Sequence, residues 1–317
     1  LKDLIRDLLQ NFGKTHYSPK SFNNHFGVPI SLSNLDIDHK YGVFEVGMSK
    51  MGEINKLSKI IQPHIGVITN IGVAHLENFK NIEGIAKAKS EIIDNIKKKG
   101  TIILNRDDKF FNYLAKKAKL NELKIVSYGQ NRKSDIYPIK IYKNKYLTKM
   151  KVKVKDENLN LIFKNLNIYN VLASLAILKE LNLNLKNILH NFRNFEPSEG
   201  RGKIHNIRRY NKNFKLIDES YNSNPTSLRN AINNFSLIKK KKTKKYLILG
   251  DMLELGSKSE MYHKDLSGVI NSSDIDKVFI KGKETLFTYK NLNKSKRGNI
   301  FQNDDDIDLI LKDVISN

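Results

Sequence analysis

The stretch that decides the fold runs from residue 41 to residue 105, where short β-rich runs alternate with helical stretches. In chain order it reads YGVFEVGM (41–48), GEINKLSKIIQ (52–62), IGVIT (65–69), IEGIAKAKSEIIDNI (82–96) and TIILN (101–105). Strands that alternate with helices predict a parallel sheet flanked by helices. Ligands of such sheets bind at the carboxyl ends of the strands. Residues that directly follow a strand are therefore the first candidates for function.

The pattern continues beyond this stretch and then changes. A helix is expected near 108–119 and a strand at KIVSY (124–128). Residues 134–165 contain two or three alternating β segments, which predict an antiparallel edge or a small added sheet. Helices are expected at about 167–180 and 184–193. The sequence thus predicts an α/β domain with a central parallel sheet and an added antiparallel segment.

A second, smaller α/β domain is expected after EPSEGRG (196–202), where one Pro and two Gly interrupt both periodicities. We place the boundary near Lys203, which gives domains of residues 1–202 and 203–317. The second domain should contain a strand ending at FKLIDES (214–220), a helix opening at Pro225 and the strand KKYLILG (244–250). A helix near 260–270 and the strand KVFIKG (277–282) complete a Rossmann-like pattern.

Composition limits the classes of function. The 317 residues include no cysteine, which excludes disulfides, thiolate metal sites and cysteine nucleophiles and leaves Mg²⁺ as the default ion. No apolar run is long enough to span a bilayer, and LKDLIRDLLQ (1–10) reads as an amphipathic helix, so we expect a cytoplasmic protein without membrane insertion. The net charge of +23 comes mainly from scattered lysines that solvate the surface. We expect no nucleic-acid partner, although a basic surface favours polyanionic substrates such as nucleotides.

One motif is rejected. Gly13-Lys14-Thr15 matches the end of the phosphate loop G-x-x-x-x-G-K-[ST], but position 8 is Leu and no strand precedes it. The loop needs a strand, a glycine-rich cradle and a helix in that order. We therefore interpret these residues as a turn after the first helix.

Other candidates follow predicted strands or open predicted helices. Glu45 lies at the end of YGVFEVGM and His75 follows IGVIT, and a carboxylate and an imidazole at strand ends can bind a metal that holds phosphate oxygens. Taken alone, Glu45 could be a capped strand-end acid and His75 a hydrogen-bonded loop residue. Lys89 lies in a lysine-rich helix whose face could simply be solvated. Asn170 opens a helix with Asn167, where a cap is the ordinary role. Asp218 ends a strand before an amide-rich loop, in which Asn also favours turns.

Taken together, these segments resemble the Mur ligases over nearly the whole chain. The segments that carry the resemblance, in that family's order, are SFNNHFGVP (21–29), FEVGMSKMGEI (44–54), PHIGVITNIGVAHLE (63–77), AKAKSEI (86–92), NIYNVLAS (167–174), GRG (200–202), DESYNSNPTS (218–227) and GDMLELG (250–256). The first and last of them are most similar to the members that join D-alanyl-D-alanine to UDP-N-acetylmuramoyl-tripeptide. The resemblance implies a nucleotide-binding central domain, a monomer, and ATP and Mg²⁺ as cofactors. In this family ATP phosphorylates a carboxylate, an amine attacks the acyl phosphate, and phosphate leaves.

The resemblance also implies roles for individual residues. Glu45 and His75 would hold Mg²⁺ together with a carbamate on Lys89, and these three would be the catalytic residues. Asn170 matches an asparagine near adenine, and Arg201 matches the hinge arginine near the phosphates. Asp218 and the loop that follows it, with Tyr221 and Asn222, match the ribose side. The substrate-binding segment, which touches the UDP-muramoyl group, matches Asn23 and Asn24.

The chain departs from the family pattern in four ways. The family's phosphate loop lies directly before a helix like LKDLIRDLL (1–9), and this sequence starts at that helix and stops soon after Lys281-Gly282. We therefore expect a fragment that does not ligate by itself. Leu166 stands where the family often has His, and Glu219 stands where it often has a second Asp. Two alternatives stay open: a sibling Mur or folylpolyglutamate-type ligase, and a non-catalytic basic α/β protein that binds nucleotides or nucleic acid.

Overall fold

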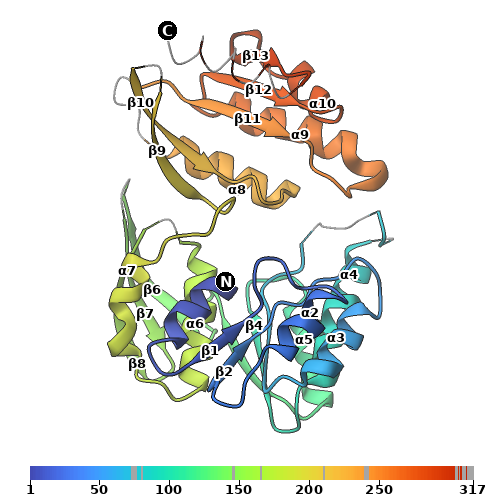
Figure 1. The fold of residues 1–317 in the computed structure, drawn as a ribbon, viewed down its shortest axis with the longest axis vertical. Coiled ribbons are helices and arrows are strands. Elements are labelled where there is room, and N and C mark those ends of the chain that lie inside the picture. Colours follow the sequence, from blue (N-terminus) through green and yellow to red (C-terminus); the bar gives the residue numbers. More distant parts are fainter. Residues whose placement is uncertain are drawn as a thin grey trace. The chain divides into compact units, whose positions relative to one another are not determined.

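The chain forms two compact units in the computed structural model, which describes residues 1–72, 77–79, 81–144, 147–164, 166–209, 211–238, 243–303, 306, 308 and 312 (Figure 1). The first unit comprises Leu1–Gly72 and Asn78–Pro197, and the second contains Glu77 and the chain from Ser198 onward. Each unit has its own sheet and its own hydrophobic core. In the described part of the chain, no helix is both long and apolar enough to cross a membrane.

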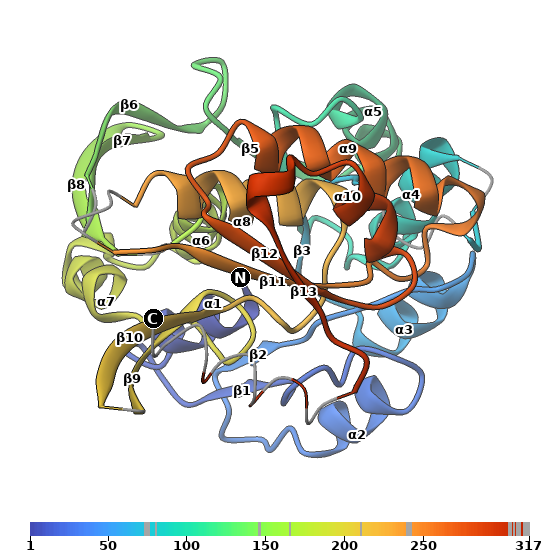
Figure 2. The ribbon, with the colours of Figure 1, turned by 90° about the horizontal axis from the view of Figure 1, so that it is seen from above.

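The first unit is built on a six-stranded sheet in the order β3-β4-β5-β6-β7-β8. Its strands are β3 (Ile65–Ile68), β4 (Thr101–Asn105), β5 (Lys124–Tyr128), β6 (Ile136–Lys143), β7 (Thr148–Val154) and β8 (Glu157–Phe163). The strands from β3 to β6 are parallel, whereas β6, β7 and β8 form an antiparallel meander, seen side by side in Figure 2. This mixed sheet confirms the predicted parallel core with an antiparallel addition.

Helices cover both faces of this sheet because its central strands are buried on both sides. Ile103 and Val126 belong to the core that contains helix α6 (Ile168–Glu180). Side chains alternate along a strand, so Ile102 and Leu104 point to the opposite face. There α5 (Phe111–Leu120) contacts β4 and β5. Helix α6 is apolar on every side and buries all eight of its residues from Val171 to Leu178.

The amino-terminal segment adds a separate two-stranded parallel sheet, and here the structure corrects one prediction. Strand β1 (Thr15–Tyr17) pairs with β2 (Tyr41–Val43), and neither belongs to the six-stranded sheet. The predicted strand 41–48 ends at Val43 because the backbone amide of Glu45 donates to the side-chain oxygen of Ser18, where a ladder would need a backbone carbonyl. Of the predicted turn Gly13-Lys14-Thr15, Gly13 and Lys14 connect the first helix to β1, whereas Thr15 already belongs to that strand.

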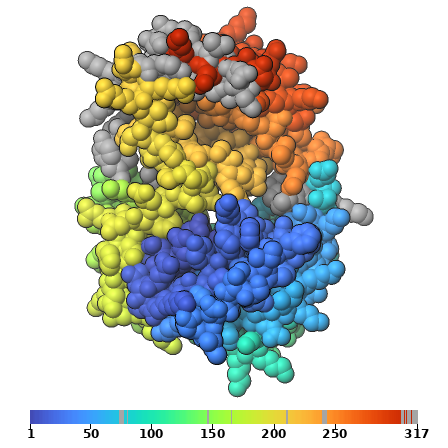
Figure 3. All heavy atoms as spheres, viewed as in Figure 1, coloured from blue at the N-terminus to red at the C-terminus, as the bar shows by residue number. Residues whose placement is uncertain are grey.

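Helix α1 (Lys2–Leu9) joins the small sheet to the larger core. Its buried face carries Leu4, Leu8 and Leu9, which pack in the same cluster as Ile103. Figure 3 shows this amino-terminal segment, in blue, on the surface of the first unit. The remaining helices of the unit are α2 (Gly27–Ser33), α3 (Glu53–Ile61), α4 (Ile82–Ser90), the 3₁₀ turns η1 (Glu91–Asn95) and η2 (Leu185–Ile188), and α7 (Leu189–Asn194).

The second unit has a three-stranded parallel sheet, β11 (Tyr246–Gly250), β12 (Lys277–Lys281) and β13 (Arg297–Ile300). The helices of this unit that lie wholly within the described residues include α8 (Pro225–Ser236), α9 (Ser259–Asn271) and α10 (Thr285–Lys290), with the 3₁₀ turns η3 (Gly256–Lys258) and η4 (Lys294–Lys296). Helix α8 begins at Pro225 as predicted, and Asn224 caps it with a reciprocal bond to Ser227.

One strand of the second unit pairs differently from the prediction. Strand β10 (Lys212–Asp218), expected in the α/β pattern, pairs in the described structure only with β9 (Lys203–Arg209), and the two form an antiparallel hairpin. The two strands are joined by only two residues, which suits an antiparallel pair, whereas a parallel pair needs a long crossover. The predicted fold class, two α/β parts with a central and mostly parallel sheet, is confirmed.

Truncating the apolar helix should test how much the first unit depends on it. Leu175 of α6 is fully buried, whereas Leu120 at the end of α5 is 77% exposed. We expect Leu175→Ala to lower the free energy of unfolding by about 2–5 kcal/mol because it leaves a cavity. The matched change Leu120→Ala should cost less than about 0.5 kcal/mol. Urea unfolding of both variants measures the difference, and equal costs would show that α6 does not organise this core.

Candidate active site

Glu45 lies just beyond β2 in a small network of polar groups. Its Oε1 accepts a hydrogen bond of 3.0 Å from Nδ2 of Asn23, and its Oε2 lies 3.8 Å from Nζ of Lys2. The carboxylate is about one-third exposed. The structure therefore brings together Glu45, the predicted metal ligand, and Asn23, the predicted substrate residue. Among the described residues each carboxylate oxygen has one close partner, so lone pairs on both remain available.

Lys2 anchors this network to the start of α1. Its ammonium donates to the backbone carbonyl oxygen of Ser18 at 2.6 Å and to that of Lys20, and only 10% of the side chain is exposed. Asn24, in contrast, uses its side-chain oxygen for the turn that opens α2, where it accepts from the amides of Phe26 and Gly27. The oxygen of Asn24 is thus committed to the fold, whereas Asn23 contacts the candidate site.

Lys89 lies on α4 and reaches the loop that follows β3. Its Nζ donates to the carbonyl oxygen of Asn70 at 2.9 Å. Burial lowers the pKa of Lys89 below its ordinary value, and the nearby Asp108 carboxylate opposes this shift. A lysine of this kind carries a larger neutral fraction at a given pH than a solvated lysine does. Lys89 is therefore set apart from the exposed lysines that dominate the composition.

Two more side chains hold the same loop. Oδ2 of Asp108, which follows β4, accepts from the amide of Ile71 at 2.6 Å. The hydroxyl of Tyr128, at the end of β5, donates to the carbonyl oxygen of Thr69 at 3.1 Å, and burial raises the pKa of this phenol. The loop 69–71 is thus fixed from α4 and from the ends of two strands. His75 lies outside the described residues, so its predicted convergence with Glu45 and Lys89 stays a prediction.

Asn170 lies near the start of α6, at the carboxyl edge of the large sheet. The helix runs antiparallel to β4, because Glu180 at its end accepts from Thr101 at the start of that strand, whereas Tyr169 at its beginning donates to Asp107 beyond the strand's end. Asn167 caps the helix through the amide of Tyr169. The half-buried amide side chain of Asn170 has no protein partner within the described ranges, so it is free to bind a ligand.

A polar cluster adjoins the start of α6. Asp107 accepts from the hydroxyl of Tyr169 at 3.1 Å and from the backbone amides of Gln130 and Asn131 at 2.5 and 3.1 Å. The amide side chain of Gln130 in turn donates to the hydroxyl of Tyr169 at 2.9 Å. This cluster ties the loops after β4 and β5 to α6. It therefore gives the edge beside Asn170 a fixed shape.

In the second unit, the predicted residues Arg201, Asp218 and Tyr221 come together. The guanidinium carbon of Arg201 lies 4.0 Å from the centre of the Tyr221 ring, a cation–π contact. Asp218 accepts from the amide of Gly200 and from both the amide and the hydroxyl of Ser220. These bonds lower its pKa, with the Ser220 side chain as the largest cause. The carboxylate thus fastens the 198–202 turn to the end of β10.

Close backbone packing holds this turn. A Cβ atom at Gly200 would lie 2.7 Å from Cβ of Tyr221, and the φ of +74° at Gly200 is in the left-handed region. Glu219, the departure from the family pattern, has a pKa raised first by burial and then by Asp218, with Arg201 opposing. Asn222 lies exposed in the loop that follows. The predicted nucleotide residues of this unit therefore lie on one rigid turn and its neighbouring loop.

GDMLELG (250–256) forms the loop after β11. Asp251 accepts from the backbone amides of Lys283 and Thr285 at 3.0 and 2.8 Å, which joins this loop to the one after β12. Nε2 of the fully buried His263 accepts from the amide of Met252, and its Nδ1 lies 2.9 Å from the carbonyl oxygen of Ser259. The acid predicted at this strand end thus organises two loops of the second unit.

Sequence reasoning missed five of these residues: Lys2, Asp107, Asp108, Tyr128 and Tyr169. A signal existed for the two acids, since NRDDKF (105–110) directly follows the strand TIILN as Glu45 follows its own strand. No comparable signal marked Lys2, because its role depends on backbone carbonyls of residues 16 and 18 positions away. The sequence contained no signal for the two tyrosines either, because the hydroxyl of each forms a hydrogen bond with a residue about 60 positions away.

Each of the two units matches a known protein-family description. The family description "Mur ligase middle domain" matches residues 1–178, and "Mur ligase, glutamate ligase domain" matches residues 204–303. The chain belongs to the Mur ligase family. The first match contains Glu45, Lys89 and Asn170, and the second contains Asp218 and Asp251. The family resemblance of the sequence motifs is confirmed.

Individual relatives agree with this family. The chain is 36% identical to the UDP-N-acetylmuramoyl-tripeptide–D-alanyl-D-alanine ligase of Buchnera aphidicola from Acyrthosiphon pisum, over 93% of the chain and 64% of the relative. It is 31% identical to the protein of the same name from Buchnera aphidicola of Baizongia pistaciae, over 100% and 67%. The chain thus spans about two thirds of the length of these curated relatives.

Solved structures of Mur ligases share the fold. MurF from Acinetobacter baumannii superposes with a TM-score of 0.88 at 27% identity, covering 99% of this chain and 67% of that one. MurF from Thermotoga maritima in complex with ADP superposes with a TM-score of 0.83 at 23% identity, over 98% and 69%. The Mur ligase fold therefore accounts for both described units.

The two asparagines at the start of α6 should differ in their effect on stability. Asn167→Ala removes the cap and should lower the free energy of unfolding by about 0.5–2 kcal/mol. Asn170→Ala removes a side chain without a described protein partner and should stay within about 0.5 kcal/mol of the parent. Thermal or urea unfolding of both variants checks this. A cost for Asn170→Ala as large as that for Asn167→Ala would mean that the amide of Asn170 serves the fold.

Proposed function

We propose that this chain belongs to an ATP-dependent amide ligase that joins D-alanyl-D-alanine to UDP-N-acetylmuramoyl-tripeptide. The observation that carries the proposal is the identity to two relatives of this name over 93% and 100% of the chain. Solved structures of MurF superpose with TM-scores of 0.83–0.88, and one of them is named for the same reaction. The TM-scores of MurC and folylpolyglutamate synthetase are lower, at 0.61–0.65. These scores favour this ligase over its siblings.

The reaction that we propose brings two anionic groups together, the γ-phosphate of ATP and a carboxylate of the tripeptide. The γ-phosphoryl group of ATP passes to a carboxylate of the tripeptide, which gives an acyl phosphate and ADP. The amine of the dipeptide then attacks the carbonyl carbon, the bond to the phosphate oxygen breaks, and phosphate leaves as the amine loses a proton. Cations and aligned donors do most of the work in such steps because charge builds up on oxygen.

The residues at the strand ends suit Mg²⁺, an ion that prefers oxygen ligands. Glu45 fits, since its carboxylate is one-third exposed and each oxygen has one close partner in the part of the chain that the structure describes. An unmodified Lys89 does not fit, because its ammonium would repel the ion. We propose that Lys89 carries a carbamate, which turns the cation into an anionic oxygen ligand, and that His75 is the third ligand. Bound Mg²⁺ would neutralise phosphate oxygens.

The surroundings of Lys89 favour a carbamate. Carbon dioxide adds to the neutral amine, and burial lowers the pKa of Lys89, so the neutral form is more populated than in an exposed lysine. The bond from Nζ to the carbonyl of Asn70 holds the amine at the edge of the sheet. Because Asp108 and Tyr128 fix the same loop, the reactive nitrogen would meet a preformed site.

The remaining predicted residues would bind the substrates. We propose that the free amide of Asn170 contacts adenine, that Arg201 contacts the phosphates, and that Asp218, Tyr221 and Asn222 shape the ribose side. Because one oxygen of Asp218 accepts from Ser220 in the following loop and the other from Gly200 in the 198–202 turn, its contribution would lie mainly in positioning these two segments.

The UDP-muramoyl group would meet the loop between β1 and α2. Asn23 is fixed there by Glu45, so the substrate and the metal ligand would share one hydrogen-bond network. Asn24 would act through the turn that it caps, because its side-chain oxygen is already used. We propose that its free amide nitrogen is the part that can reach the substrate.

Phosphate release tests the function. In a protein that contains this chain together with the phosphate loop expected before Leu1, phosphate should form only when ATP, UDP-N-acetylmuramoyl-tripeptide and D-alanyl-D-alanine are all present. Lys89→Ala should abolish turnover, and bicarbonate should not rescue it. Glu45→Ala and His75→Ala should raise the Mg²⁺ requirement, since each leaves the other ligands in place. Release without the dipeptide, or full turnover by Lys89→Ala, would contradict the assignment.

Carbamate formation can be tested on the chain itself. After exchange into ¹³C-bicarbonate, we expect a carbamate carbon signal by NMR that grows as the pH rises toward the lowered pKa of Lys89, because the neutral amine becomes more abundant. The signal should vanish in Lys89→Ala and persist in Lys116→Ala, which removes an exposed lysine of α5. Equal signals from both variants would assign the carbamate to other amines.

A further inference from the structure

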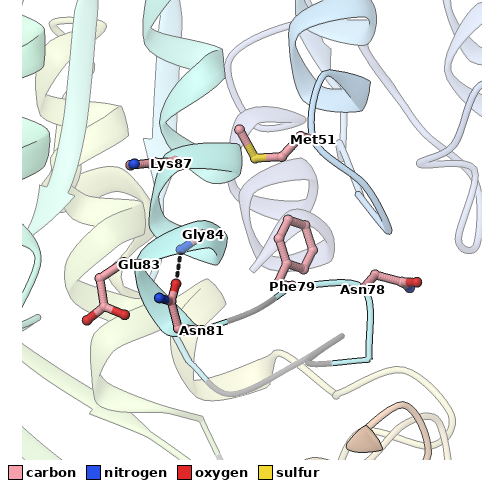
Figure 4. A pocket seen from close by; sticks show the side chains of 7 residues that line it. All are labelled: Met51, Asn78, Phe79, Asn81, Glu83, Gly84 and Lys87. Carbon is pink, nitrogen blue, oxygen red and sulfur yellow. Dashed lines mark hydrogen bonds between the residues drawn. The ribbon is translucent and has the colours of Figure 1, made fainter.

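A pocket of about 390 Å³ opens beside α4 in the first unit. It is lined by residues of α4 and the two segments that approach it, and Figure 4 shows their side chains. Small-molecule sites usually have volumes of about 300–1,000 Å³, so a compact ligand fits. None of its lining residues holds a role in the site described above, although the pocket shares α4 with Lys89.

Two opposite charges line this pocket and neither is neutralised. Glu83 and Lys87 are four residues apart on α4, so both side chains emerge from one face of the helix. Both side chains are exposed, and neither side chain forms an ion pair or a hydrogen bond within the ranges that the structure describes. A carboxylate and an ammonium are thus offered side by side. A ligand would not have to break a protein ion pair to reach them.

The other lining residues form an apolar wall with amides at its rim. Phe79 is buried and Met51 is 54% exposed, and in Figure 4 both lie on the other side of α4 from the Glu83 and Lys87 side chains. The segment that carries Met51 is held in place, because Oε1 of Glu91 accepts from the amide of Gly52 at 2.7 Å. The rim amides belong to Asn78 and Asn81. The wall is therefore preformed and suits short aliphatic groups.

We propose that this pocket binds an amino-acid zwitterion, with its ammonium at Glu83, its carboxylate at Lys87 and its aliphatic part against Met51 and Phe79. This inference rests on the proposed function, because both substrates of that reaction can supply such a group. One source is D-alanyl-D-alanine, whose methyl groups match the apolar wall. The other is the last residue of the tripeptide, if it has a free amine and a carboxylate on its side chain.

Calorimetric titration of the chain at low salt distinguishes the two sources. The probes are D-alanyl-D-alanine, D-alanyl-D-alanine amide, L-lysine and meso-diaminopimelate. Tighter binding of the dipeptide than of the free diamino acids identifies the dipeptide as the occupant, and the reverse order identifies the tripeptide end. Either order supports the zwitterion site. If none of the four probes binds at a concentration of about 10 mM, which corresponds to a binding free energy of about 2–3 kcal/mol, the zwitterion site is contradicted.

Variants locate the binding. Glu83→Gln and Lys87→Gln should each weaken the preferred zwitterion by about 3- to 10-fold, the range of a solvent-accessible charge contact. If the dipeptide is the occupant, its amide, which lacks the carboxylate, should lose affinity with Glu83→Gln but not with Lys87→Gln. The control Lys116→Gln removes an exposed lysine elsewhere and should change nothing. Unaltered affinity in both pocket variants, with circular dichroism showing a folded chain, would overturn the proposal.

The ligation assay separates this inference from the proposed function. If Lys87→Gln raises the KM of one substrate and leaves kcat and the KM of ATP unchanged, both ideas stand. If ligation occurs and neither pocket variant changes the KM of either substrate, the pocket proposal fails while the function stands. If no ligation occurs but titration shows zwitterion binding that depends on Glu83 and Lys87, the pocket stands and the function fails.

Discussion

The structure of the first unit depends on burying one helix against one sheet. Helix α6 hides every residue from Val171 to Leu178, so it can exist only between the strands and the layer that contains α1. That constraint also fixes its direction, since Glu180 is bonded to the start of β4 and Tyr169 to the residues beyond its end. The amino end of α6, which carries the amide of Asn170, therefore lies at the carboxyl edge of the parallel strands, where ligands bind in sheets of this kind.

The same edge of the sheet is held by hydrogen bonds to the loop 69–71, and one of the donors is the buried amine of Lys89. Thr69, Asn70 and Ile71 form bonds to Tyr128, Lys89 and Asp108, which come from three separate elements. Burying an amine without a full counter-charge disfavours its charged form, and this is the physical origin of the lowered pKa of Lys89. A site that stabilised the ammonium fully would be a poor place for carbamate chemistry. The loop and the lysine therefore depend on each other.

Two acids at strand ends serve the backbone. Asp218 fastens the turn around Gly200, and Asp251 joins the loops after β11 and β12. Each occupies a strand end, where unpaired amides gather and a carboxylate accepts them strongly. Glu45 differs from these two because its carboxylate accepts from the side-chain amide of Asn23, lies near Lys2 and accepts no backbone amide among the described residues. Acidic residues are thus common at strand ends. Their hydrogen bonds distinguish the acids that hold a loop in place from those that remain free to bind a ligand.

The sequence by itself determined the α/β class, the antiparallel addition, the helix start at Pro225 and the family, because these depend on local periodicity and on short motifs. Tertiary structure alone decided which strands share a sheet. The run 41–48 stops at Val43 because Ser18, distant in sequence, supplies a side-chain oxygen to Glu45. Tertiary structure alone also placed Lys2 beside Glu45. Contacts between residues far apart in sequence leave no local pattern, because their partners meet only after the chain has folded.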